Sequence, residues 1–240
     1  MPDHVMNVLS AEGDPKEVKR LFATIGGGRD EYGEPILIDF NKIKPIPKSL
    51  DIECSSRSDK ALENYTAFID ESSALAQAGA ALGISETDEH KEKVARLLEK
   101  HTNIQNDNPK LWKLGKQCYE NIVKHGAPTW YEWVRANWGT KWNAYSQGQS
   151  RDSEISFQTA GANVNGLIEV LSAQFPKLRF SYFYAAEDFG CNAGHVEYEN
   201  GERTLEHCPE DGSLEAMALA TEILGDDIYA EEMEPEIAPS

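Results

Sequence analysis

The stretch SEISFQTAGANVNGLIEVLSAQFPKLRFSYFYAA, residues 153–186, contains a complete strand–helix–strand pattern. Apolar and polar residues alternate in SEISFQTA and again in KLRFSYFYAA, which is the period of a half-buried strand. Between these two runs, Leu167, Leu171 and Phe175 recur at helical spacing. Pro176 follows and ends the helix. The segment therefore predicts one β-α-β half of a domain.

A second β-α-β pattern opens the chain. Residues 4–10 alternate weakly and are predicted to form a strand. Residues 14–25 follow as a predicted helix, with Asp14 as its N-cap and Pro15 at the first helical position. The run PILIDFNKI, residues 35–43, then predicts another strand. Two β-α-β halves on one antiparallel sheet describe a ferredoxin-like α+β sandwich.

The predicted ferredoxin-like β-α-β-β-α-β sandwich carries a large helical insertion and an extra C-terminal hairpin strand and helix. The first half is assigned to residues 1–58, the helical insertion to residues 59–138, and the second half to residues 139–225. The two halves form one domain. In the second half, Asn200-Gly201 is a strong signal for a two-residue hairpin turn. Residues 226–240 are acidic and contain proline, so they are expected to form a disordered tail.

Four of the five tryptophans lie in WYEWVRANWGTKWNAY, residues 130–145. Trp130 and Trp133 are three residues apart, and Trp138 continues the same side of a helix. Such spacing is typical of residues in a core, and we favour that interpretation. The alternative is an aromatic platform for a nucleobase or for a basic side chain of a partner.

Motifs that resemble catalytic or metal sites lack their supporting residues. Residues 188–190 spell the magnesium-binding DFG triplet of kinases, but no glycine-rich loop or catalytic loop accompanies them. Four thiol and imidazole groups could meet on the hairpin: Cys191, His195, His207 and Cys208. The last two are adjacent, so in a strand they point to opposite faces, and chance clustering is favoured over a zinc site. We predict no catalytic residue, no metal and no cofactor.

The cysteines and the apolar pattern indicate a cytoplasmic protein. The cysteines are scattered and form no CxxC motif, so we predict free thiols in a reducing compartment. The start of the chain shows no secretory signal, and no apolar run approaches the length that spans a bilayer. We therefore expect no contact with a membrane. The four cysteines are Cys54, Cys118, Cys191 and Cys208.

The charge of the chain is concentrated at its C-terminal end. The protein has 23 basic and 41 acidic residues, a formal net charge of −18. Ser181 to Ser240 contains 16 of the acidic residues and a single basic residue, Arg203, which gives −15 and leaves −3 for the rest. Such a field repels phosphate backbones and attracts basic protein surfaces. Tyr182 and Tyr184 could stack on RNA bases, but the surrounding acids argue against direct nucleic-acid binding.

Four motifs are spread along the chain: DHVMNVLSAEGD at residues 3–14, IDFNKIKPIPKSL at residues 38–50, WGTKWNAY at residues 138–145 and EDFGCNAGHVEYENG at residues 187–201. On these motifs the chain resembles the YubB ferredoxin-like family of plasmid and phage proteins. The four motifs occur in matching order, while the helical insertion and the acidic tail match weakly. The resemblance implies an accessory protein of a mobile genetic element with a ferredoxin-like sheet, and it implies no reaction.

The leading hypothesis is a non-enzymatic protein from a phage or plasmid that binds and blocks a basic protein of the host. The target would be a nucleic-acid-binding defence factor in the host cytosol, and the acidic surface would act as a DNA mimic. Such a protein would be anti-defence in its effect. The residues expected to contact the partner are Glu197, Glu199, Glu202, Glu206, Glu210, Asp211, Asp226 and Asp227.

Two further classes of function stay open. The chain could bind a nucleotide or another small ligand, and could then be an enzyme, with a pocket between the sheet and the insertion. The ligand-binding residues would be Trp138, Lys141, Trp142 and Tyr184. The chain could also be a structural or self-assembling module, and its oligomeric state is left open by the sequence.

Overall fold

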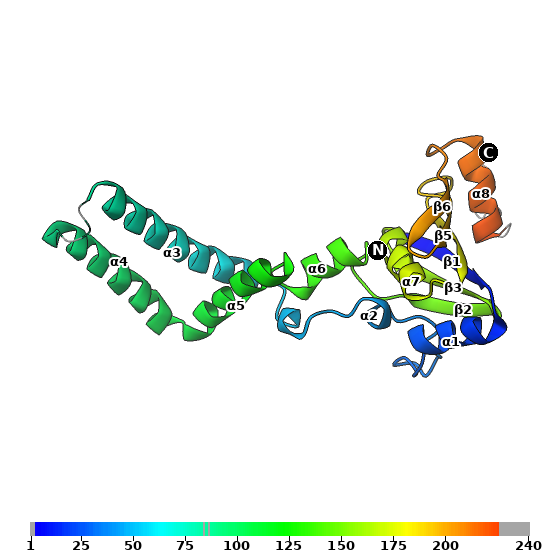
Figure 1. The fold of residues 1–240 in the computed structure, drawn as a ribbon, viewed down its shortest axis with the longest axis horizontal. Coiled ribbons are helices and arrows are strands. Elements are labelled where there is room, and N and C mark those ends of the chain that lie inside the picture. Colours follow the sequence, from blue (N-terminus) through cyan, green and yellow to red (C-terminus); the bar gives the residue numbers. More distant parts are fainter. Residues whose placement is uncertain (1–2, 84, 86, 226–240) are drawn as a thin grey trace, which may run out of the picture. The chain divides into compact units, whose positions relative to one another are not determined.

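The computed structural model describes residues 3–83, 85 and 87–225 (Figure 1). The predicted acidic tail, residues 226–240, lies outside the described residues. Among the described helices, none combines the length and the apolar content that crossing a bilayer requires.

The chain forms two compact units, and the helical insertion is one of them. The first unit combines Met1–Pro45 with Val134–Ser240, and the second unit is Ile46–Trp133. The boundaries thus differ from the predicted insertion, which ran from residue 59 to residue 138. The second unit begins earlier because the proline-containing segment after residue 45, including the 3₁₀ helix η1 (Lys48–Leu50), packs with the insertion. Helix α6 (Trp130–Asn137) begins in one unit and ends in the other.

One antiparallel sheet organises the first unit, and its spatial order is β2-β3-β1-β4-β5-β6. Its strands are β1 (His4–Glu12), β2 (Tyr145–Arg151), β3 (Glu154–Ala160), β4 (Arg179–Ala186), β5 (Gly194–Glu199) and β6 (Glu202–His207). Its helices are α1 (Pro15–Ile25), α2 (Phe40–Ile43), α7 (Asn165–Gln174) and α8 (Leu214–Leu224).

The order of these elements along the chain confirms the predicted ferredoxin-like fold. β1, α1, β2, β3, α7 and β4 follow one another as β-α-β-β-α-β. Because β3 lies between β1 and β2 and is antiparallel to both, β1 and β2 run parallel as a split β-α-β unit. β5, β6 and α8 are the predicted extra hairpin and helix.

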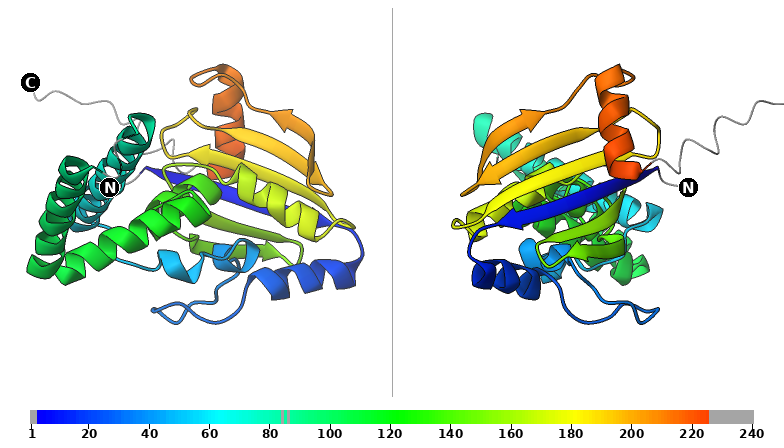
Figure 2. Two further views of the ribbon diagram at one scale, coloured as in Figure 1. Left: turned by 60° about the vertical axis from the view of Figure 1, so that its left-hand side comes forward. Right: turned by 90° about the vertical axis from the view of Figure 1, so that its right-hand side faces the viewer.

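Helices cover the two faces of the sheet unequally. Helices α1, α2 and α7 lie on one face, called here the α7 face, and α8 lies against the other, the α8 face (Figure 2). Strand alternation places the large buried side chains on the α7 face, among them Leu9, Phe157, Tyr182 and Val196. On the α8 face, Leu219 and Ala220 of α8 pack against Ala185, a smaller cluster.

The start of α1 and the C-terminal hairpin form as predicted. The Asp14 carboxylate accepts a hydrogen bond from the Lys16 amide at 2.8 Å, as an N-cap does. Asn200 and Gly201 both have positive φ, at 51° and 80°, which is the backbone conformation of the tight turn between β5 and β6.

The strand predicted at residues 35–43 is wrong. This segment approaches β2, but side chains rather than a ladder with that strand satisfy the amides of Leu37, Ile38 and Phe40. The amides of Ile36 and Asp39 donate to backbone carbonyls on the other side, those of Gly28 and Ile25. The Gln147 carboxamide accepts from Leu37 N at 2.7 Å and Ile38 N at 2.9 Å, and donates to Ile38 O at 3.0 Å. The segment then ends as the short helix α2, which Asp39 caps. The apolar pattern correctly indicated burial, because Ile38 is fully buried, but the buried residues lie in a loop and a helical turn rather than in a strand.

The strand that completes the first β-α-β unit is β2, and the sequence did not predict it. Its residues, YSQGQSR, are polar and lack alternating apolar side chains. The pairing with β3 is interrupted by register shifts, and Ser146 has a positive φ of 47°. β2 is held at the edge of the sheet by pairing with β3 rather than by burial of its own side chains.

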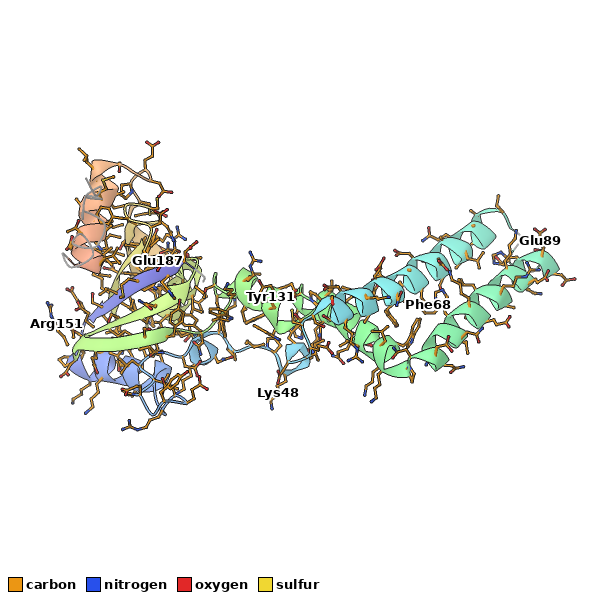
Figure 3. All side chains as sticks on the ribbon, turned by 180° about the vertical axis from the view of Figure 1, so that it is seen from behind. Lys48, Phe68, Glu89, Tyr131, Arg151 and Glu187 are labelled. Atoms are coloured by element: carbon orange, nitrogen blue, oxygen red, sulfur yellow. The ribbon has the colours of Figure 1, made fainter. Side chains whose placement is uncertain are left out.

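Three helices make up most of the second unit: α3 (Ser56–Ala81), α4 (Asp88–Asp107) and α5 (Pro109–His125). Side chains cap the starts of two of them: the Ser55 hydroxyl caps α3 and the Asn108 side chain caps α5. An aromatic cluster joins them. At its centre is Phe68 of α3 (Figure 3). The ring centroid of Phe68 lies 4.7 Å from that of His101 of α4 and 5.4 Å from that of Trp112 of α5.

The tryptophan-rich segment divides between core and surface. Trp133 and Trp138 are buried, which confirms the core interpretation for these two residues. The indole N–H of Trp138 donates to the Lys44 carbonyl at 2.9 Å. For Trp142 that interpretation is wrong, because 46% of its surface is exposed. It follows Gly139, whose positive φ of 86° turns the chain out of the helix.

The four cysteines are free, and we expect them to differ in reactivity. Burial raises the pKa of the Cys118 thiol to about 11, so at pH 8 it stays protonated. An aromatic disulfide reagent at pH 8 should therefore label the exposed Cys54 and Cys208 quickly and Cys118 only after unfolding. The pKa is raised only in the folded chain, so the folded chain holds the thiol proton more tightly than the unfolded chain does. The resulting stabilisation is complete below about pH 9 and is lost as the pH rises toward 11. Labelling of native Cys118 at the rate of Cys54, followed by mass spectrometry, would contradict this prediction.

Candidate functional site

The candidate site is the β5–β6 hairpin with the loop that leads to α8. β6 is the outer strand of the sheet, and all six of its residues are exposed. The hairpin supplies Glu197, Glu199, Glu202 and Glu206, and the loop supplies Glu210 and Asp211. Asp226 and Asp227, which were also predicted to contact a partner, lie outside the described residues.

The pleat of the hairpin divides these carboxylates between two faces. Glu199 is directly opposite Glu202 in the strand register, on the α8 face with Glu197. Glu206 is opposite Val196, which is buried on the α7 face. The predicted carboxylates therefore surround the outer strand instead of sharing one side of it. Two like charges directly opposite each other, as Glu199 and Glu202 are, destabilise the free hairpin.

Two arginines compensate part of this negative charge. Arg179 of β4 pairs with Glu197 at 2.9 Å and with Glu199 at 3.3 Å. Arg203 of β6 pairs with Glu206 at 2.8 Å. Arg203 also reaches Glu169 of α7, at 3.5 Å. These pairs are half exposed, so each contributes only about 0–1 kcal/mol of stability.

Three further carboxylates of the site, those of Glu202, Glu210 and Asp211, form no ion pair with a cation in the part of the chain that the structure describes. Glu202 and Glu210 are both exposed. The Asp211 carboxylate accepts a hydrogen bond from the Asn192 amide at 2.8 Å, which orients the loop. The uncompensated charge is therefore centred on the hairpin turn and the loop rather than on β5.

His195 lies beside these carboxylates on the α8 face. Its ring stacks on Phe183 with centroids 3.9 Å apart, and its Nε2 lies 2.8 Å from the Ser181 hydroxyl. The pKa of His195 is lower than its usual value, chiefly because the ring is partly buried. The ring is therefore neutral at pH 7 and adds no positive charge to the site. The Glu197 carboxylate is 3.9 Å from the same Nε2, so it does not orient the other ring nitrogen as the acid of a catalytic triad does.

The thiols and imidazoles of the hairpin do not gather into a metal site. His195 is paired with His207 across the strands, whereas the Cys208 thiol lies 3.2 Å from the Tyr184 hydroxyl. Neighbouring His207 and Cys208 thus have different surroundings, as the pleat requires. Within residues 3–83, 85 and 87–225, no group of three or more potential ligands could hold a metal ion.

The four residues proposed for a small ligand do not form one pocket within the first unit. Trp138 and Tyr184 are buried, at 3% and 4% exposure, and each is engaged in the core. Lys141 lies over the exposed ring of Trp142, with its amine 4.6 Å from the centroid. That pair is a surface cation–π contact.

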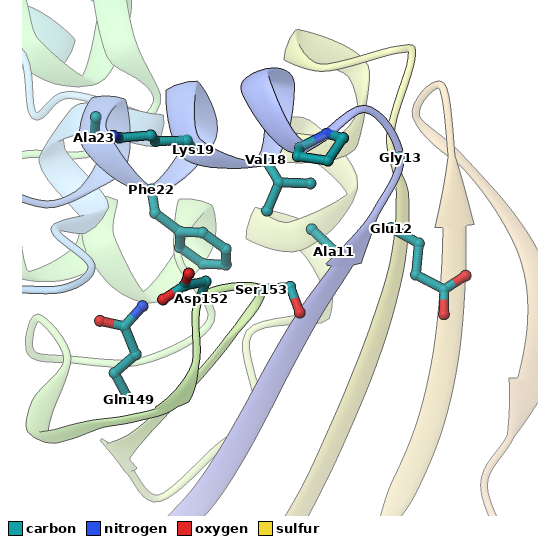
Figure 4. A pocket seen from close by; sticks show the side chains of 11 residues that line it. Ala11, Glu12, Gly13, Val18, Lys19, Phe22, Ala23, Gln149, Asp152 and Ser153 are labelled. Carbon is teal, nitrogen blue, oxygen red and sulfur yellow. The ribbon is translucent and has the colours of Figure 1, made fainter.

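The structure instead shows a groove that the sequence did not predict, between α1 and the turn joining β2 to β3. Its volume is about 830 Å³. Val18 and Phe22 of α1 line its apolar side, and Gln149 of β2 and Asp152 of the turn lie across from them. In Figure 4 the ring of Phe22 points toward Asp152. Only the tertiary structure brings these two segments together, since more than a hundred residues separate them in the sequence.

Comparison with known proteins bears on the region that contains the hairpin. Residues 141–237 match the model of a family described as a ferredoxin-like domain in Api92-like protein. This range covers β2 to β6, α7 and α8, and so includes the whole candidate site. The description names a fold and no reaction. It supports a ferredoxin-like domain and leaves the activity open.

Among solved structures, the chain is similar to the crystal structure of a protein api92 from Yersinia pseudotuberculosis. The sequence identity is 12% and the TM-score is 0.33, with 89% of this chain and 100% of that chain covered. None of the curated proteins matches the chain.

Proposed function

We propose that this protein is a non-enzymatic interaction protein that binds and blocks a basic, nucleic-acid-handling protein. The contact surface is the β5–β6 hairpin with the loop before α8. The observation that carries the proposal is the exposed outer strand with Glu199 and Glu202 directly opposed and no cation assigned to Glu202 or Glu210 in the described part of the chain. A basic partner would neutralise these carboxylates and so relieve their mutual repulsion. The relief of that repulsion would then contribute favourably to the free energy of association.

The same charge argues for a protein partner rather than a nucleic acid. Phosphate groups approaching the hairpin would meet two arginines, Arg179 and Arg203, that are already paired with carboxylates. A protein that normally holds phosphates presents lysine and arginine, which the carboxylates could engage in place of DNA. The chain would thus act as a DNA mimic.

The cellular setting belongs to the same proposal. The motifs shared with the YubB family suggest a phage or plasmid origin, and a host defence protein that handles nucleic acids is then the natural target. Free cysteines are consistent with action in the host cytosol. The protein would be anti-defence in effect.

Displacement of DNA tests the proposal. The chain should release a fluorescent DNA duplex from a basic, sequence-independent DNA-binding protein, as measured by anisotropy. Displacement should weaken as salt is raised. The hairpin variant combines Glu199→Lys, Glu202→Lys, Glu206→Lys and Glu210→Lys and should be at least about tenfold less effective.

The matched control carries the same change in charge elsewhere on the first unit. It combines Asp3→Lys, Glu12→Lys, Glu31→Lys and Glu34→Lys, all at exposed positions. Both variants move the formal net charge from −18 to −10. The control should retain displacement. Equal losses in the two variants would show that overall charge acts without a defined surface, and an unaffected hairpin variant would rule out this surface.

A second candidate function rests on the groove beside α1. Its volume of about 830 Å³ is within the range of small-ligand sites. The charged residues that line it are Glu12, Lys19 and Asp152, a net charge of −1. Together with its apolar side, this charge suits an apolar amine better than a nucleotide, whose phosphates the two carboxylates would repel. Thermal stabilisation by such an amine, lost in Asp152→Asn, would favour this function over the first.

A further inference from the structure

The second unit leaves apolar side chains of α4 uncovered. Among the α4 side chains that the structure describes, only His90 and His101 are buried. Val94 and Leu97 are partly exposed, and Leu98 retains 53% of its surface. A helix with an apolar stripe is stable when the stripe packs against another element, and here α3 covers it incompletely.

A groove between α3 and α4 shows where the packing is incomplete. Its volume is about 300 Å³, and Leu75 and Ala76 of α3 line it together with Val94 and Leu98 of α4. The hydroxyl oxygen of Ser72, which also lines the groove, is buried without a hydrogen-bond partner among the described residues. Helices α3 and α4 therefore leave a partly apolar groove open along one side of their contact.

The exposed side of α4 has the spacing of a helix-packing seam. Lys91, Ala95, Leu98 and Thr102 are separated by four, three and four residues, and all are exposed. Ala95 stands near the middle of this row, where its small side chain allows a second helix to approach closely. Leu98 is the large apolar side chain of the row and stands next to the groove.

Charge indicates that the second helix comes from another copy of this chain. Lys91 and Glu99 each lie four residues from Ala95, on either side of it. Two α4 helices packed antiparallel about Ala95 would place Lys91 of each copy opposite Glu99 of the other. Residues 46–133 hold 14 acidic and 11 basic residues, a net charge of −3, against −15 for the rest of the chain. The second unit is thus the part where two copies repel each other least.

We propose that the protein forms a twofold-symmetric dimer through antiparallel packing of α4 against α4 of a second copy. Leu98 of each protomer packs beside Ala95 and Lys91 of its partner, and the two Lys91–Glu99 pairs flank the apolar contact. The four helices α3 and α4 of both protomers then bury the side chains that one protomer leaves open.

Two matched substitutions in the full-length chain test the apolar contact. Sedimentation velocity over a wide concentration range should show a monomer–dimer equilibrium for the unchanged protein. Leu98→Asp should raise the dimer dissociation constant at least about tenfold. Val123→Asp is the control, because Val123 is 73% exposed on α5 and lies away from the groove. It should leave the dissociation constant unchanged, and circular dichroism should show equal helix content in both variants.

A charge exchange tests the antiparallel register. Lys91→Glu alone places two carboxylates opposite each other in each pair, and Glu99→Lys alone places two amines opposite each other, so each variant by itself should be monomeric. Mixing the two variants restores opposite charges at both pairs and should restore the dimer. The substituted residues are two helical turns apart within one chain, so their contacts within a protomer do not mimic this rescue.

The dimer proposal is overturned by any of three results. The first is an unchanged chain that stays monomeric at the highest concentration measured. This result would overturn the dimer even if a different protein were later found to cover the groove. The second is equal association of Leu98→Asp and the unchanged chain. The third is a mixture of the charge variants that stays monomeric. None of these results depends on the hairpin carboxylates, so they leave the proposed function unaffected.

Discussion

Replacing Tyr182 by phenylalanine should lower the free energy of unfolding of the first unit by about 2–4 kcal/mol. Tyr182 is fully buried on β4, and its hydroxyl donates to Asn7 Oδ1 at 2.5 Å. The same oxygen accepts from the Val164 amide at 2.9 Å, where α7 begins. Removing the hydroxyl leaves a buried donor and a buried acceptor unsatisfied, and each costs about 1–3 kcal/mol.

The effect of Tyr182→Phe is large because the surrounding network has no spare partner. Asn7 donates its amide hydrogens to Val5 O, Phe157 O and the Thr159 hydroxyl, so its side chain cannot turn without breaking these bonds. Burial holds the pKa of Tyr182 well above its usual value, so the hydroxyl remains a donor at neutral pH.

Native-state hydrogen exchange of the β1 and β4 amides measures this loss in the first unit alone. The control is Tyr145→Phe, because the Tyr145 hydroxyl makes one contact with His4 Nδ1, at 2.7 Å, in a partly exposed position. The control should cost less than about 1 kcal/mol, since water can replace the hydroxyl. A Tyr182→Phe effect no larger than that of the control would show that the buried network contributes little.

Replacing Gly115 by alanine should destabilise the second unit by about 3 kcal/mol, although alanine favours a helix over glycine by about 1 kcal/mol. Gly115 lies on α5 where it crosses α3. A Cβ atom there would be 2.1 Å from the Ala61 carbonyl oxygen and 3.0 Å from the Tyr65 Cβ. The first of these neighbours is helical backbone, so the two helices must separate.

Cys118, one helical turn after Gly115, reports this separation directly. Its thiol is inaccessible in the folded chain, and in Gly115→Ala it should react with an aromatic disulfide reagent at a rate approaching that of Cys54. The control is Gly166→Ala in α7, where an added Cβ meets nothing within 4 Å. That variant should raise the stability of the first unit by no more than about 1 kcal/mol, from the helix propensity of alanine, and should leave the labelling of Cys118 unchanged. Protected Cys118 in Gly115→Ala would show that the helices absorb the methyl group.

Local signals in the sequence were sufficient for several elements. The Asn200-Gly201 turn, the Asp14 cap and the alternation in β1, β3 and β4 each depend on residues close together in the chain, and each forms as expected. For the candidate site, the sequence located the acidic hairpin residues. It could not tell that Arg179 of β4 compensates two of them, because that pairing depends on strand register.

The sequence by itself determined the ferredoxin-like class, because three patterns of period two and two of helical period occur in the required order. The tertiary structure alone decided which segment completes the first half. PILIDFNKI has a strand's composition but hydrogen-bonds to the side chains of Asn143 and Gln147, and polar β2 becomes the edge strand. The physical reason is that β2 gains its hydrogen bonds from β3, which follows it after a two-residue turn, and β3 is itself held in the sheet by pairing with β1, more than a hundred residues earlier in the chain. Nothing in the side chains of YSQGQSR records that arrangement.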